Sequence, residues 1–313
     1  MTRPAPTWLP EGVHLGVAPI CWTNDILLDL GGDIPLETCL AEAAAAGYQG
    51  IELGRLFPRD ARTLRPLLDG YGLDLVSGWY SGFLADRDVE EEWRAARPHV
   101  QLLQAMGCAV LVYGECGRMP GSAPLDEPLS RSPALGSEEW ADYAERVTTF
   151  AERLRNEGLQ LAYHHHLMMV VENGDEIDRF MAAAGPAVGL LLDTGHATAA
   201  GIDYRRLIDR YGTRIAHVHL KSIRQDVLAE VRANDLSFNE AVRRGVFTVP
   251  GDGAVDLSPI AHFAQGGFRG WLVVEAEQRP EPIPPSARVS AAFRHLEARF
   301  SSEREGSCAI SGA

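Results

Sequence analysis

Short apolar runs alternate with segments of helical periodicity along almost the whole chain. Eight runs are typical of buried strands: 14–20, 50–54, 73–79, 108–114, 159–166, 188–193, 214–220 and 271–277. Amphipathic helices are expected after them at 35–47, 61–72, 91–107, 137–158, 174–185, 203–212, 234–245 and 286–300, and most of these segments stop at a glycine that can cap a helix. This alternation favours βα units and a parallel sheet.

Eight consecutive βα units without a linker predict an α/β fold of the TIM-barrel type, a (β/α)8 barrel that forms a single domain over residues 1–301. A doubly wound open sheet is the alternative. However, no GxGxxG follows the first strand and no phosphate-binding P-loop motif occurs. Two long loops, at 114–136 after the fourth strand and at 221–258 after the seventh, are expected to cover or line the site. Residues 302–313 are expected to form a disordered C-terminal tail.

The net charge of −14 argues against nucleic acid and anionic membranes as partners, because both favour a basic surface. No apolar run approaches the roughly 20 residues that cross a bilayer, and the N-terminus lacks the pattern of a signal peptide. The five cysteines contain no CxxC pair. We therefore expect a soluble, cytoplasmic protein that acts on a small molecule, and a homo-oligomer is compatible with this composition.

Polar side chains gather where the predicted strands end, which is the end at which a TIM barrel carries its active site. They are Asn24, Glu52, Trp79, Glu115, His164, His166, Asp193, His196, His217, His219 and Glu275. Residues two apart share one face of a strand, so His164 and His166 are expected to point the same way and His165 the other way.

The last four predicted strands each end in a residue of a metal-binding type. A single histidine in a barrel is more often a core residue than a ligand, and a lone Asp193 before a helix is often an N-cap. Four consecutive strands with such residues nevertheless favour a metal site. Aspartate, glutamate and imidazole together suit Mn, Co, Zn or Mg rather than a thiolate site.

Five motifs span nearly the whole barrel: "GYQGIELG" (47–54), "LLLDTGHA" (190–197), "HVHLKS" (217–222), "PGDGAVDL" (250–257) and "WLVVEAE" (271–277). In these motifs the chain resembles the xylose isomerase-like barrel superfamily, which includes sugar epimerases and sugar phosphate isomerases. The resemblance implies a divalent metal held by Glu, Asp, His and Glu from strands five to eight. Asp193, His219 and Glu275 match the last three positions, whereas His164 stands at the first.

This histidine bears on the reaction. The family's epimerases and isomerases resemble two-base enzymes with a glutamate on each side of the substrate carbon, and His164 replaces one of them. Together, "PICWTND", "AYHHH" and "DTGHA" look most like the inosose dehydratase branch of the superfamily. That branch implies a hydro-lyase of myo-inositol catabolism, which removes water from 2-keto-myo-inositol to give a diketone.

The resemblance further implies Mn or Co as the metal, with Mg or Zn as alternatives, and it brings in glutathione through the family alone. The expected metal ligands are His164, Asp193, His219 and Glu275. The expected catalytic residues are His166, His196, Glu275 and Lys221, without a choice of which histidine is the base. The expected substrate-binding residues are Asn24, Glu52, Trp79, Glu115 and His217, with Trp22 and Tyr80 extending an apolar wall.

Two other functions stay open from the sequence. One is a sugar or sugar phosphate isomerase or epimerase, which acts on ketoses through an enediolate on the same scaffold. The other is a non-catalytic sugar-binding barrel. Metal content and the reaction product distinguish these alternatives.

Overall fold

The chain forms a closed barrel of parallel strands in a computed structural model that describes residues 6–121 and 123–311. The barrel strands are β1 (Val13–Val17), β2 (Gly50–Leu53), β3 (Asp74–Gly82), β4 (Val110–Glu115), β5 (Gln160–His164), β6 (Val188–Asp193), β7 (Ile215–Leu220) and β10 (Gly270–Val274). They follow one another around the barrel, and β10 pairs with β1 to close it. The predicted (β/α)8 fold is confirmed.

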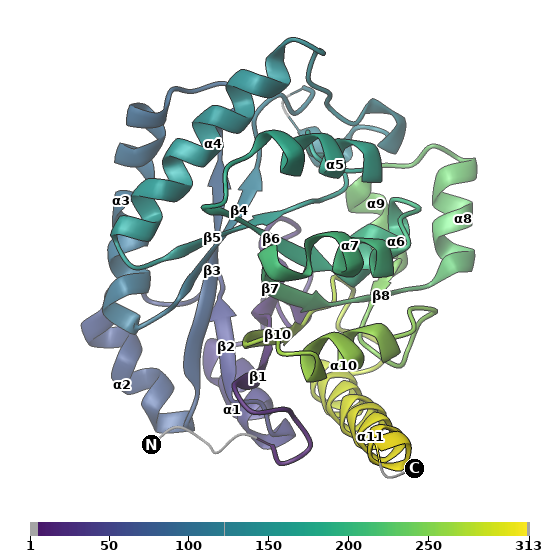
Figure 1. The fold of residues 1–313 in the computed structure, drawn as a ribbon. Coiled ribbons are helices and arrows are strands. Elements are labelled where there is room, and N and C mark those ends of the chain that lie inside the picture. Colours follow the sequence, from purple (N-terminus) through teal and green to yellow (C-terminus); the bar gives the residue numbers. More distant parts are fainter. Residues whose placement is uncertain (1–5, 122, 312–313) are drawn as a thin grey trace.

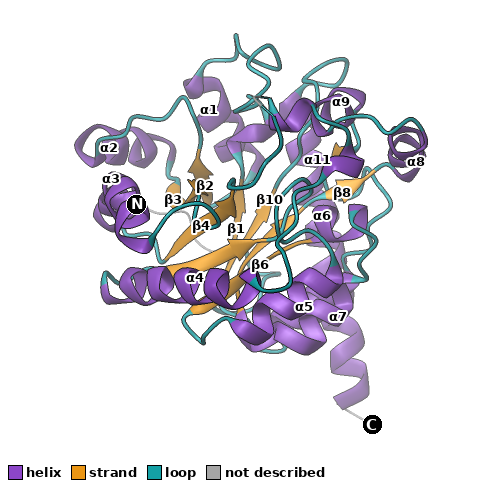
Figure 2. Ribbon diagram, turned by 90° about the horizontal axis from the view of Figure 1, so that it is seen from above, coloured by secondary structure: helices purple, strands orange, loops and turns teal. Residues whose placement is uncertain are grey.

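Helices surround the barrel, as Figures 1 and 2 show. They are α1 (Leu36–Ala46), α2 (Ala61–Tyr71), α3 (Val89–Met106), α4 (Glu139–Asn156), α5 (Gly174–Ala183), α6 (Thr194–Ala199), α7 (Tyr204–Tyr211), α10 (Ser258–Gln265) and α11 (Pro285–Ser311). Their apolar faces and the outward residues of the strands form the main core. Gly47, Gly72 and Gly107 end α1, α2 and α3 in the left-handed conformation, as the sequence predicted.

A smaller core fills the barrel interior. Val112 pairs with Ala162 across β4 and β5, and both belong with Leu191 to an apolar cluster that is separate from the main core. Ala162 lies two residues before His164, and Leu191 lies two residues before Asp193. Since residues two apart share a face of a strand, these polar side chains stand directly above the apolar interior layer.

The connection between β7 and β10 differs from the prediction. A helix was expected over residues 234–245 and does form there, but α10 rather than this helix leads into β10. The connection first makes α8 (Gln225–Ala233) and α9 (Phe238–Arg244), together with a two-stranded antiparallel sheet of β8 (Ser222–Ile223) and β9 (Phe247–Thr248). A signal for α10 was present, since proline at its first turn suits a helix start.

Three element ends also differ from expectation. Strand β5 ends at His164 and β10 ends at Val274, so His166 and Glu275 lie just beyond their strands. Helix α11 continues to Ser311, past residue 301 and through Gly306. Residues 312–313 lie outside the described residues, and the domain limit at residue 301 stays a prediction. No described helix is both long and apolar enough to span a membrane.

Candidate active site

The four expected metal ligands meet at the carboxyl end of the barrel. His164 ends β5, Asp193 ends β6, His219 lies near the end of β7, and Glu275 follows β10. All four side chains are buried. His164 Nε2 lies 3.5 Å from Asp193 Oδ2, and His219 Nδ1 lies 3.7 Å from the same oxygen and 2.8 Å from Glu275 Oε2. The sequence prediction that they converge is therefore matched by their placement.

Two atoms at the centre of this cluster are buried without a hydrogen bond of acceptable geometry, namely Asp193 Oδ2 and His219 Nδ1. With His164 they form a set whose ligand atoms all lie within 4.8 Å of one another. His164 Nδ1 bonds to the carbonyl oxygen of His165 at 2.6 Å, so its Nε2 is left with a free lone pair. Buried polar atoms without partners are costly, and a divalent cation would satisfy them. The residues fit a metal ion.

Asp193 also shapes the backbone beside the cluster. Its Oδ1 accepts a hydrogen bond from the amide of His196 at 2.7 Å, which caps the short helix α6. One carboxylate oxygen therefore fixes the start of α6, and the other points at the histidines. From the sequence, Asp193 could be either an N-cap or a metal ligand. The geometry is compatible with both roles at once.

Glu52 lies below the cluster and links two histidines of β7. Its Oε1 accepts hydrogen bonds from Ser77 Oγ (2.6 Å), His217 Nε2 (2.9 Å) and His219 Nε2 (3.2 Å). Burial opposes its ionisation, yet the two histidines hold the pKa of the carboxyl well below its ordinary value. Burial alone would also lower the pKa of His219, but Glu275 and Glu52 hold it well above its ordinary value. Glu52 and His217 thus orient His219 from behind.

Lys221 lies fully buried among the acids of the site. Its Nζ is 2.6 Å from Glu275 Oε1, 2.9 Å from Glu277 Oε1 and 3.6 Å from Asp193 Oδ2. Burial would lower the pKa of Lys221, but these three carboxylates hold it well above its ordinary value. Glu277 was absent from the residues expected to act, although its spacing of two from Glu275 in "VVEAE" was a usable signal.

The imidazoles of His166 and His196 lie against each other, with ring centroids 3.7 Å apart and ring planes tilted by 35°. His166 Nδ1 bonds to the carbonyl oxygen of Leu167 at 2.6 Å. The pKa of both rings lies well below the ordinary value, mainly because of burial and secondarily because of a neighbouring histidine and Lys221. Two neutral imidazoles therefore stand beside the metal-type cluster, which is the state a general base requires.

Of the three residues expected in an apolar wall, Trp79 alone faces the site. Its ring is 36% exposed and lies 5.5 Å from the ring of His164, so one aromatic face is available to a ligand. Trp22 is buried and donates to Glu42, and Tyr80 donates to Glu92. Phe238 and Phe247, which the sequence analysis did not single out, pack against His196 instead.

Two expected substrate-binding residues lie in other networks. Asn24 Oδ1 accepts from the amides of Ile26 and Leu27, so it shapes the turn after β1. Glu115 accepts from Tyr113 Oη (2.8 Å), Tyr143 Oη (3.1 Å) and the amides of Ala85 (3.2 Å) and Gly117 (2.8 Å). The hydrogen bonds described for both side chains serve neighbouring loops and helices rather than the histidine cluster.

Two segments meet beside the site, and we call them the clasp: residues 126–132 of the loop after β4, and residues 235–239, which follow α8 and include the start of α9. Its hydrogen bonds join Leu129 N to Leu236 O (3.1 Å), Ser130 N to Asp235 Oδ1 (3.1 Å), Ser130 Oγ to Asp235 Oδ2 (2.6 Å) and Asn239 Nδ2 to Asp126 Oδ1 (2.8 Å). A hollow of about 240 Å³ beneath it is lined in part by Leu167, which follows His166. The clasp thus borders the site.

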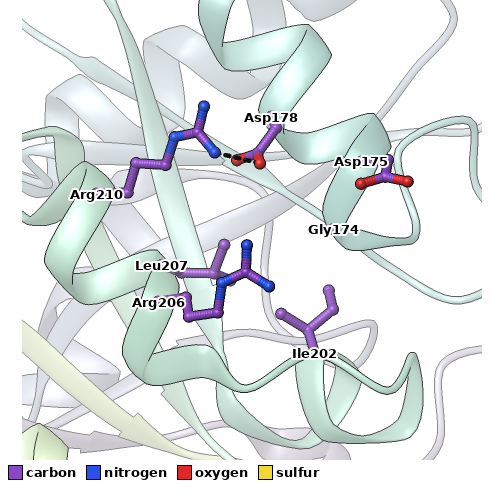
Figure 3. A pocket seen from close by; sticks show the side chains of 7 residues that line it. All are labelled: Gly174, Asp175, Asp178, Ile202, Arg206, Leu207 and Arg210. Carbon is purple, nitrogen blue, oxygen red and sulfur yellow. Dashed lines mark hydrogen bonds and ion pairs between the residues drawn. The ribbon is translucent and has the colours of Figure 1, made fainter.

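A second hollow, of about 80 Å³, lies between α5 and α7 and is drawn in Figure 3. Arg210 there pairs with Asp178, while Arg206 and Asp175 point into the same groove. None of its lining residues belongs to the histidine and carboxylate clusters. The sets of possible metal ligands among the described residues therefore lie outside this groove.

The chain matches the model of the xylose isomerase-like TIM barrel family over residues 40–299. It belongs to this family. Among curated relatives, it is 47% identical over 287 residues to the rhizopine catabolism protein MocC of Rhizobium meliloti, a match that covers 91% of this chain and 87% of that protein. It is 40% identical over 276 residues to the inosose dehydratase of Geobacillus thermodenitrificans (strain NG80-2), covering 87% and 92% of the two chains.

Solved structures share the fold at low sequence identity. The IOLI protein, solved with a bound zinc atom, superimposes with a TM-score of 0.68 at 16% identity and covers 92% of this chain and 98% of that one. Such a likeness concerns the barrel itself. The arrangement of side chains at the mouth has to be argued from this chain.

Proposed function

We propose that the protein is an inosose dehydratase, a hydro-lyase that removes water from 2-keto-myo-inositol to give a diketone. One observation carries the proposal: a metal-type cluster and a pair of neutral imidazoles share one barrel mouth in a chain 36–40% identical to inosose dehydratases over most of its length. His164 in place of a second catalytic glutamate favours elimination over epimerisation, which needs a base on each side of the carbon.

The metal would be held by His164, Asp193, His219 and Glu275. When bound, a divalent cation acts as a Lewis acid that makes the hydrogen beside the ketone more acidic. The donor set of imidazole and carboxylate suits Mn or Co, the metals we propose, and also accommodates Zn or Mg. Glutathione stays an expectation drawn from the family alone.

The remaining residues of the mouth move protons and hold the ring. We assign His166 and His196 to proton transfer: one neutral imidazole takes the proton from carbon, and the imidazolium so formed, directly or through the neighbouring ring, gives this proton to the β-hydroxyl, which leaves as water while both rings return to the neutral form. Trp79 supplies an aromatic face for the C–H side of a polyol ring. Glu52, which is hydrogen-bonded to both His217 and His219, orients His219. We leave Asn24 and Glu115 outside this set, because their described hydrogen bonds lie elsewhere.

The test is to incubate the metal-loaded protein with 2-keto-myo-inositol and to follow the ultraviolet absorbance of the enolised diketone. We expect diketone from the wild type, and a large loss in His166→Gln and His196→Gln with the metal retained. His262→Gln is the matched control, because this histidine is exposed on α10. Interconversion of free ketoses without diketone would replace this proposal by the isomerase alternative.

A second substrate deserves a parallel assay, because the relative at 47% identity is named for rhizopine catabolism. A rhizopine-derived ketone is therefore the second candidate. Faster turnover of that compound than of 2-keto-myo-inositol would favour it. A cytoplasmic location and a homo-oligomeric state are also proposals, to be tested by cell fractionation and light scattering.

A further inference from the structure

A second set of metal-binding types lies beside the first. The ligand atoms of His166, His196 and Glu277 lie within 4.8 Å of one another, and all three residues are buried. Two imidazoles and a carboxylate are ligands that transition metals accept readily. The site described above uses His164, Asp193, His219 and Glu275. A further set of the described residues, Glu52, His217 and His219, shares His219 with that site, so the barrel mouth offers separate donors for two cations rather than one.

The side chain of Lys221 reaches into this second set. Its Nζ is 2.9 Å from Glu277 Oε1 and 3.1 Å from His196 Nε2, which are the atoms that would bind a metal. It also lies 2.6 Å from Glu275 Oε1, a carboxylate of the first set. The ammonium therefore stands where a second cation would stand, and it bridges the two clusters.

The stem of Lys221 has little room to move away. Its backbone amide donates to Thr194 Oγ1 at 3.1 Å, and this hydroxyl donates to the carbonyl of Lys221 at 2.7 Å. A Cβ placed on Gly195 would lie 2.6 Å from Lys221 Cγ, so the lysine stem packs directly on that glycine. The ring of Phe247 covers the ammonium at 5.0 Å. The charge is thus fixed in position.

The choice of lysine is specific to this position. The basic residues of the chain are 28 arginines and a single lysine, which is Lys221. A guanidinium is planar and spreads its charge, whereas an ammonium is a compact point charge with donors directed around it. A compact cation is what a pocket built like a metal site can accept.

We propose that the ammonium of Lys221 occupies the cation position of the second cluster, so that the protein binds one divalent ion where its side chains could otherwise hold two. Without this charge, Glu277 would be a buried carboxylate lacking a cationic partner, and a second metal ion would supply one. The inference rests on the metal site of the proposed function. Lys221 is a positioning residue in this account.

The experiment counts metal ions by inductively coupled plasma mass spectrometry and by titration with Mn²⁺, Co²⁺ and Zn²⁺. We expect one equivalent in the wild type, two in Lys221→Met, and one again in Lys221→Met combined with Glu277→Gln. Two equivalents in the wild type, or one in a folded Lys221→Met variant, would overturn the inference and leave the proposed function standing. No metal in the wild type would overturn both.

A second measurement covers the case in which Lys221→Met does not fold. Protein labelled with ¹⁵N-lysine contains one side-chain nitrogen, so its ammonium signal needs no assignment. We expect this signal to persist when one equivalent of metal is added, because the ammonium stays in place. Its loss on metal addition would show that the ion displaces Lys221 and would overturn the inference.

Discussion

Two regions of this molecule contain buried carboxylates, and they differ in the groups that contact the carboxylate oxygens. Glu115 accepts four hydrogen bonds, two from tyrosine hydroxyls and two from backbone amides, and Tyr143 also bonds to Tyr163 at 2.7 Å. Both of its oxygens are satisfied by neutral donors. We call this the tyrosine network. Its components tie α4 and the loops after β3 and β4 to the barrel, which is a structural role.

The cluster at the barrel mouth has the opposite character. Its carboxylates face histidines and one lysine, and Asp193 Oδ2 and His219 Nδ1 are left without a satisfactory hydrogen bond. Burying charge in this way destabilises a fold unless a ligand compensates. The comparison teaches that burial alone does not mark a functional acid. The unsatisfied atoms and the surrounding cations do.

The largest expected effect breaks the mouth cluster at its centre. Asp193→Asn keeps an N-cap for α6 but removes the charge that faces His164 and His219. Loss of a Lewis acid worth several kcal/mol predicts a fall in activity of about a thousandfold or more. Metal analysis and the diketone assay measure it. Asp203→Asn, which alters the exposed cap of α7, is the control, and full metal content in Asp193→Asn would contradict the prediction.

The second effect concerns the tyrosine network and its pH dependence. Burial raises the pKa of Glu115 to about 7 from 4.5, in spite of its hydrogen bonds. Between these pH values the unfolded chain releases a proton that the folded chain keeps, so the folded state loses stability as pH rises, by about 3 kcal/mol at most. Below 4.5 and above 7 the contribution is constant.

Glu115→Gln cannot ionise and should lack this slope. The measurement is urea unfolding of both proteins in the presence of a chelator, from pH 4.5 to pH 7.5. The difference between their free energies of unfolding should change across this window, while metal affinity of the variant stays that of the wild type. A constant difference would mean that Glu115 titrates normally.

The third effect concerns Glu52, which supports the expected metal ligand His219 but is not itself an expected ligand. Glu52→Gln removes the charge that His217 and His219 share, and an outer partner of this kind is typically worth a 10- to 100-fold change in metal affinity. Isothermal titration with Mn²⁺ measures it. Glu42→Gln serves as control, because Glu42 also accepts an N–H, from Trp22, but outside the cluster. Equal Mn²⁺ affinities in Glu52→Gln and Glu42→Gln would mean that Glu52 does not support metal binding.

The smallest expected effect concerns a hydroxyl of the tyrosine network. Tyr143→Phe removes the hydroxyl between Glu115 and Tyr163 and should lower the free energy of unfolding by about 1–2 kcal/mol, with metal content unchanged. Chemical unfolding measures it. Tyr211→Phe, which removes a hydroxyl bonded to Asp178 on α5, should cost less because that site is nearer to solvent. A drop in metal content of Tyr143→Phe would mean that the two groups are linked.

The sequence predicted the convergence of His164, Asp193, His219 and Glu275, because the ends of consecutive parallel strands meet at one mouth. It also separated His165 from its neighbours. This histidine is buried, and its Nε2 accepts from the amide of Asp193 at 3.4 Å, and it belongs to none of the three sets of possible metal ligands among the described residues. Strand periodicity carries this kind of information well.

The sequence could not place residues whose position depends on tertiary contacts. Glu115 is the last residue of β4 and Glu52 the last but one of β2, but a tyrosine from α4 and the amide of Ala85 draw Glu115 away from the mouth. The contacts of Lys221 with Asp193, Glu275 and Glu277 depend on where β6, β7 and β10 end relative to one another. The helices α8 and α10 were missed because a long connection of mixed periodicity resembles a loop.

Phe238 of the clasp lies against both imidazoles to which we assign proton transfer, with ring centroids 5.1 Å from His166 and 6.0 Å from His196. Both histidines are buried, so in the proposed reaction a proton taken from carbon would be kept from bulk solvent. In heavy water, substrate recovered before full conversion should then carry little deuterium, because the proton on the imidazole would exchange slowly with the solvent.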